Sequence, residues 1–207
     1  MHNISVTLET LPDPPKLESI WRSLATRSDH SIFQSWPWVR CWLDMPDVEP
    51  SLLIARDGDT VVGLALIQDS IQHRRFMRIP TLYLQETGDP DIDSLFIEYN
   101  GFLTDRACSN AVVAACLNFL ITQPDGWREL QLSGVSDTLK TCAEQADAHC
   151  EIRSDRTSYF VDLDTLRAQD QPYLDALSRN TRQHHNRSRR HIEKIGPLQL
   201  HRARDVS

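Results

Sequence analysis

Glycine is scarce in this sequence of 207 residues, which contains only seven. G-x-G-x-x-G, the P-loop and G-x-S-x-G are all absent. The first two motifs provide the tight turns and backbone N–H groups that hold dinucleotides and nucleoside triphosphates. The sequence therefore gives no support for Rossmann cofactor binding or nucleotide hydrolysis.

Paired cysteines are also missing. The five cysteines are odd in number and include no C-x-x-C pair: Cys41, Cys108, Cys116, Cys142 and Cys150. We expect reduced thiols, and neither a disulfide framework nor a zinc site. His184 and His185 point about 100° apart on a helix, so they cannot easily chelate one ion, and we expect no bound metal.

Long apolar runs are absent as well. The longest, AVVAACLNFLI at residues 111–121, is too short to span a bilayer. The first residues show neither the basic nor the apolar region of a signal peptide. We expect a cytoplasmic protein without a transmembrane segment.

The segment SLLIARDGDTVVGLALIQD, residues 51–69, is the clearest local pattern. Two apolar runs flank Asp57-Gly58-Asp59, and a D-G step supplies the positive φ angles of tight turns, so we predict a β-hairpin. Strand patterns at 4–11 and 158–163 and helix patterns at 16–28 and 107–123 surround it. This order predicts an α/β (α+β) fold, with a mixed, partly antiparallel sheet flanked by helices.

A basic stretch stands out in a chain whose formal net charge is -7. Residues 179–194 carry five arginines, one lysine and three histidines against one glutamate, on a helix predicted from Asp170 to Gly196. Arginine's fork suits phosphate, so we expect a phosphorylated small molecule, glycan or lipid-linked ligand; a solvated surface is the alternative. No aromatic residue is interleaved and the whole chain is acidic, which disfavours nucleic acid.

Trp38 and Trp42 lie four residues apart on a helix predicted to begin near Ser35, with Pro37 in its first turn. They share one helix face. They either pack in the core or form an aromatic wall of a ligand groove.

Three segments in order resemble the CelD-like acetyltransferases of the GNAT superfamily. They are SIFQSWPWVRCWLD, LLIARDGDTVVGLALI and PYLDALSRNTRQHHNRSRRHIEKIGPLQL. The resemblance implies tandem GNAT-like halves, similar to FemAB aminoacyl transferases, with a first lobe at 1–195 and the start of a second at 196–207. It also implies transfer of an acyl group from acetyl-CoA or another acyl-CoA to an amine or hydroxyl of a sugar or an envelope or exopolysaccharide precursor.

The resemblance also suggests candidate residues. Those for holding a phosphorylated donor or acceptor are Arg179, Arg182, Arg187 and Arg190. His184, His185 and Glu98 are candidates for the catalytic base, and the sequence does not choose among them.

One departure from the family pattern is clear. The R/Q-x-x-G-x-G/A turn that holds the CoA pyrophosphate at a helix N-terminus is absent. We therefore expect this chain to be the N-terminal half of a longer enzyme and to lack activity alone. The alternatives are a non-catalytic lobe that binds a glycan or lipid-linked phosphate, and a FemAB-like aminoacyl transferase. The sequence leaves the oligomeric state open.

Overall fold

The structure is a computed structural model that describes residues 3–93, 97–123, 126–146, 148–157, 159–199 and 201. The chain divides into two compact units, residues 1–151 and 152–207, and each is described by itself. The basic stretch belongs to the second unit. The prediction of GNAT-like lobes at 1–195 and 196–207 stays a prediction.

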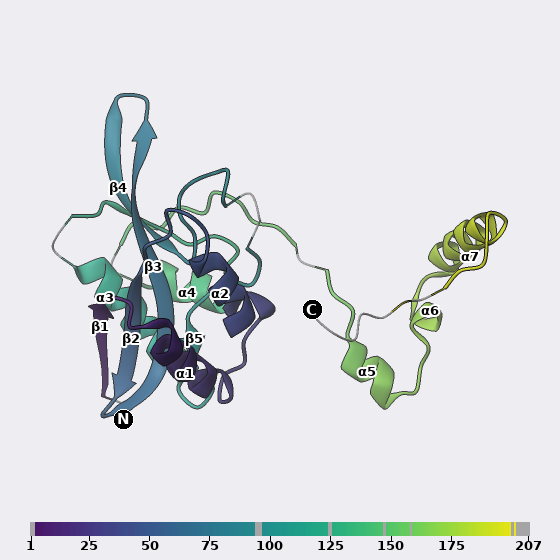
Figure 1. The fold of residues 1–207 in the computed structure, drawn as a ribbon, viewed down its shortest axis with the longest axis horizontal. Helices are drawn as coiled ribbons and strands as arrows, with labels where there is room; N and C mark the ends of the chain where they lie inside the picture. The colour runs from purple at the N-terminus through teal and green to yellow at the C-terminus, as the bar shows by residue number, and fades with distance from the viewer. Residues whose placement is uncertain are drawn as a thin grey trace. The chain divides into compact units, whose positions relative to one another are not determined.

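A mixed sheet forms the centre of the first unit (Figure 1). Its described strands are β1 (Ile4–Glu9), β2 (Ser51–Asp57), β3 (Thr60–Arg74), β4 (Met77–Leu84), β5 (Leu103–Thr104) and β6 (Glu129–Gln131). The main order is β1-β2-β3-β4-β6, in which only the β4–β6 pairing is parallel, and β5 pairs with β3. The predicted hairpin is confirmed, with Gly58 at a φ of 58° in the turn.

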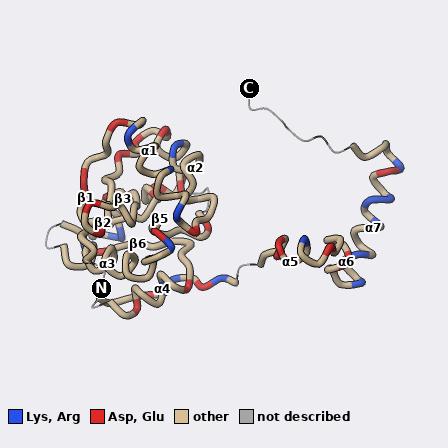
Figure 2. Tube along the Cα trace, turned by 90° about the horizontal axis from the view of Figure 1, so that it is seen from below, with Lys and Arg blue, Asp and Glu red and all other residues tan. Residues whose placement is uncertain are grey.

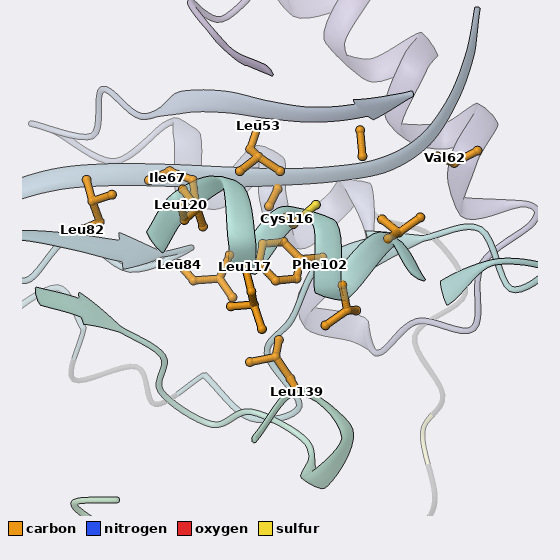
Figure 3. Packing of buried hydrophobic residues seen from close by; sticks show 14 of the residues in the cluster. Leu53, Val62, Ile67, Leu82, Leu84, Phe102, Cys116, Leu117, Leu120 and Leu139 are labelled. Carbon is orange, nitrogen blue, oxygen red and sulfur yellow. The ribbon is translucent and has the colours of Figure 1, made fainter. Parts of the chain in front are cut away.

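Helices cover both faces of this sheet. They are α1 (Pro14–Ala25), the 3-10 helix η1 (Ile32–Gln34), α2 (Trp36–Leu43), α3 (Ser109–Thr122) and α4 (Asp137–Glu144). Because side chains alternate along a strand, Leu52 and Ile54 pack with α1 and α2, whereas Leu53 and Ala55 pack with α3. Figure 3 shows the second of these layers, where Leu53 and Ile67 face Leu117 and Leu120 of α3. The predicted fold class is confirmed.

The long strand β3 has neighbours along both edges, and two strands share one of these edges. Along the first edge, β3 pairs with β2 from Thr60 to Ile67. On the opposite edge, β4 pairs with β3 as far as Leu84↔Ile67, and β5 takes over at Leu103↔Leu64. β4 therefore leaves the ladder where β5 enters it, and the chain between them must turn away from the sheet.

The second unit contains α5 (Leu163–Ala168), α6 (Tyr173–Ala176) and α7 (Arg179–Glu193), and none of their described residues is buried. The strand predicted at 158–163 is wrong for its described residues. The carboxylate of Asp162 accepts the Thr165 N–H at 2.9 Å and caps α5. The helix predicted from Asp170 to Gly196 is interrupted, because Leu177 is extended and Ser178 caps a new helix.

Among the residues that the structure describes, no helix combines the length and apolar character needed to cross a bilayer.

The first unit contains both hydrophobic clusters, so we expect residues 1–151 to fold alone. A protein ending at Glu151 should unfold cooperatively, with a thermal midpoint within a few degrees of that of the whole chain. Circular dichroism during heating measures this. Residues 152–207 alone should be largely unfolded, since none of the described helical residues there is buried and short isolated helices are marginal in water. A shortened protein without a cooperative transition would contradict the prediction.

Candidate functional site

A cleft of about 130 Å³ lies between α2 and the chain that follows β4. Its lining residues are Trp38, Cys41, Trp42, Met45, Gln85, Glu86, Ile92, Asp93 and Ile97. One wall is aromatic and apolar, and the opposite wall carries two carboxyl groups. Such a mixture of an apolar wall and a few polar groups is typical of small-molecule sites.

Helix α2 positions the aromatic wall. Pro37 lies in its first turn, where a missing N–H costs nothing. Trp42 is buried and belongs to the core on this side of the sheet, whereas Trp38 is half-buried. The rings of Trp38 and Phe33 pack in a T-shaped arrangement, with ring centroids 4.7 Å apart. Trp42 is thus anchored in the core, and Trp38 is held by a ring contact while part of it stays accessible.

Buried amides hold the end of β4. Gln85 has a φ of 52°, and its N–H still donates to the Leu66 carbonyl at 2.9 Å. Its Nε2 donates to Asn100 Oδ1 at 2.8 Å, and Asn100 Nδ2 donates to the Leu84 carbonyl at 2.8 Å. The Gly101 N–H also donates to Asn100 Oδ1 at 2.8 Å. This Gln85–Asn100 network fixes the chain where it leaves the sheet.

The Asp93 carboxylate organises the loop beyond Glu86. It accepts the N–H groups of Thr87 at 2.9 Å and Gly88 at 2.7 Å, and also the Thr87 hydroxyl at 3.0 Å. Gly88 has a φ of 79°, and a Cβ there would lie 2.6 Å from the Tyr83 ring. The loop therefore requires glycine at this position and is tightly constrained.

Glu86 is the most unusual group in the cleft. The residue is only 9% exposed, and its Oε2 has no hydrogen-bond partner among the described residues. Burial raises the pKa of its carboxyl, because a charged group loses solvation there. A hydrogen bond with Ser133 lowers this pKa, and the negative charge of Asp93 raises it further. A carboxyl of this kind is a candidate acid–base group.

An acidic hollow adjoins the cleft and shares Ile92 and the loop with it. Its lining includes Asp47, Asp69 and Asp89. The region around Glu86 therefore carries negative charge, which favours cationic over anionic ligands.

The sequence-predicted residues are divided between the two units. Trp38 and Trp42 line the cleft, and Glu98 is exposed directly after the buried residue Ile97. Sequence reasoning missed Glu86. Its one local signal is the polar pair Gln85-Glu86 immediately after the apolar end of a strand.

Helix α7 holds the remaining candidates. Figure 2 shows basic residues repeated along it. Arg179, Arg187, Arg190, His184 and His185 are exposed. Arg182 is half-buried and donates to the carbonyls of Asp175 at 3.0 Å and Leu177 at 2.9 Å. That arginine supports its own helix junction, and a role of the others in phosphate binding stays a prediction.

The start of α3, which follows β5, does not fit a CoA pyrophosphate. The preceding turn has no glycine, and its Asp105 carboxylate accepts the Ala107 N–H at 3.0 Å and pairs with Arg27 at 2.7 Å. A second anion would be repelled by Asp105. Arg27 and the Ala107 N–H lower the pKa of Asp105, which keeps it ionised. We therefore assign no described residue to an acyl-CoA.

Within the described ranges, no three His, Cys, Asp or Glu side chains gather into a possible metal site.

Comparisons with known proteins give one structural likeness. No family model matches the sequence, and neither does any curated protein. The chain is similar to an aminoglycoside acetyltransferase from an uncultured soil metagenomic sample, solved in complex with trehalose, with 13% identity and a TM-score of 0.40. The alignment covers 77% of this chain and 97% of the other. A likeness of this size carries no information about substrate or chemistry.

The raised pKa of Glu86 predicts a pH-dependent stability. In the folded protein the pKa of Glu86 lies above 4.5, its value in the unfolded chain. The carboxyl therefore makes its full contribution to stability below pH 4.5, and this contribution is lost as the pH rises through the folded-state pKa. E86Q should therefore gain unfolding free energy relative to the wild type as pH rises above about 4.5. Urea unfolding at several pH values measures this. E98Q, at an exposed carboxyl, is the control, and a difference that does not vary with pH would contradict the prediction.

The Gln85–Asn100 network predicts a large loss of stability on truncation. N100A leaves the buried Leu84 carbonyl and Gly101 N–H without their side-chain partner. We expect the free energy of unfolding to fall by about 2–4 kcal/mol. Chemical denaturation measures the loss, with N180A on exposed α7 as the matched control. Equal effects of the two substitutions would contradict the role of the network.

Proposed function

We propose that this chain supplies the acceptor side of an acyltransferase, with Glu86 as the general base. The observation that carries the proposal is a buried carboxyl of raised pKa in a cleft walled by Trp38 and Trp42. The resemblance of the sequence to CelD-like acetyltransferases suggests the reaction class. The acceptor would be an amine or hydroxyl of a sugar or an envelope precursor.

A base is needed because an acceptor must lose a proton as it attacks a carbonyl carbon. A carboxylate of ordinary pKa is a weak base at neutral pH, and burial makes Glu86 more basic. The tightly bonded loop and Ser133 restrict how the carboxyl can move. Such positioning of a base beside the acceptor is a large part of what acyl transfer requires from a protein.

The charges around the cleft favour an amine over a phosphorylated acceptor. Glu86 and Asp93 line the cleft, and three further aspartates line the adjoining hollow. A phosphate would be repelled there, whereas an ammonium group would be attracted and could rest on the face of Trp38. A phosphorylated partner would instead suit the arginines of α7.

A non-catalytic lobe that binds an amine-bearing glycan is the second candidate. It is favoured by the turn before α3, which has no glycine and whose Ala107 N–H already donates to the Asp105 carboxylate. Binding requires the cleft and its carboxyl groups but no acyl donor.

Because no described residue is assigned to an acyl-CoA, a small thioester such as phenyl thioacetate replaces the donor. Release of its free thiol in the presence of amino sugars or diamines tests Glu86 as the base. We expect release with amines and none with the corresponding neutral sugars. E86Q should slow it by about 10²–10⁴-fold, the usual contribution of a general base, while E98Q should not. The wild-type rate should rise with pH through the raised pKa of Glu86, because the base must be ionised.

Quenching of tryptophan fluorescence by the same amines separates the two candidates. Quenching that is lost in W38A, without thiol release, would reject the enzyme and favour the binding lobe. Thiol release that survives E86Q at full rate would reject Glu86 as the base.

A further inference from the structure

The hairpin formed by β3 and β4 extends past the rest of the sheet (Figure 1). Its ladder runs from Ile67↔Leu84 to Arg74↔Met77, and Arg75 and Phe76 form the turn. β2 accompanies β3 only as far as Ile67, and β6 pairs with β4 only over residues 81–83. The end of the hairpin therefore has no strand on either side among the described residues.

The hairpin tip, defined as residues 71–78, exposes large apolar side chains. Phe76 is 102% exposed, Met77 62% and Ile71 43%. Single exposed apolar residues are ordinary on a protein surface. A group of them at the end of a projecting element is typical of an interaction site.

The same tip is strongly basic. His73, Arg75 and Arg78 are exposed, and no acidic residue occurs between Asp69 and Glu86. Arg74 is held by Glu129 through two contacts of 2.6 Å. Neither Arg75 nor Arg78 forms an ion pair within the part of the chain that the structure describes. These cations stand out against a formal net charge of -7 for the chain.

Arg75 has a φ of 54°, in the left-handed region that favours glycine. The turn between β2 and β3 has a glycine at the corresponding backbone conformation, Gly58 with a φ of 58°. The tip thus carries an arginine in a conformation that costs it free energy.

We propose that the hairpin tip binds the surface of a lipid bilayer with anionic headgroups. Phe76 and Met77 enter the interfacial region, while Arg75 and Arg78 contact headgroup phosphates. Basic residues beside exposed apolar ones are the combination that such surfaces attract. The proposal does not depend on the proposed function.

Other partners fit the hairpin tip less well. Two tips of like charge repel each other, which disfavours a second copy of this chain. A single turn is too small for a stable protein interface, which buries about 1,200 Å² or more. Nucleic acid would be repelled by the acidic remainder of the protein.

Flotation of the whole chain with lipid vesicles tests the proposal. We expect binding to phosphatidylcholine vesicles that contain phosphatidylglycerol, weaker binding at high salt, and little binding to phosphatidylcholine alone. F76S/M77S should abolish binding, whereas I32S, at another exposed apolar residue on η1, should not.

R75G separates binding from folding. Glycine relieves the strain, so the thermal midpoint should stay equal or rise, while affinity for the anionic vesicles falls about fivefold with the loss of one cation. R22Q, which removes an exposed arginine on α1, should leave binding unchanged.

Three vesicle results would overturn the proposal. They are equal binding to both vesicle types, no binding to either vesicle type, and unchanged binding in R75G. The proposal would also be overturned if the protein bound a DNA duplex but not the vesicles. Dimers that are seen in sedimentation and that F76S/M77S dissociates would overturn it as well.

Discussion

Strand β3 offers one edge to two partners, and the cleft depends on this shared edge. β4 occupies the edge down to Ile67, and β5 occupies it from Leu64. Because two strands cannot pair with the same residues, the chain after Leu84 has to leave the plane of the sheet. It leaves toward α2, and this brings Glu86 opposite Trp38 and Trp42.

Holding the chain in that position requires buried polar groups. Gln85, Asn100 and Gln34 are each less than 10% exposed, and each forms hydrogen bonds with side chains or main-chain atoms. A satisfied network of this kind rigidifies its surroundings, whereas an unsatisfied group in the same place would be costly. Glu86 differs, because one of its oxygens has no partner among the described residues. That asymmetry sets Glu86 apart from the amides that hold the chain in place.

The charges of the chain are segregated. The first unit gathers carboxyl groups around the cleft and places arginines at the hairpin tip, and the second unit carries the basic helix α7. A single average such as the net charge of -7 hides this pattern. The cleft therefore differs in the sign of its charge from the hairpin tip and from α7.

The sequence by itself determined what depends on neighbouring residues. The Asp57-Gly58 turn, the α2 face shared by Trp38 and Trp42, and the mixed sheet with helices all follow from φ preferences and periodicity. Only the tertiary structure decided which strands share an edge, that Glu86 meets α2, and that its carboxyl is buried. The strand expected at 158–163 was wrong for the same reason, since a strand exists only with a partner and Asp162 caps a helix instead. Pairing and burial join residues far apart in the chain, and no local pattern encodes them.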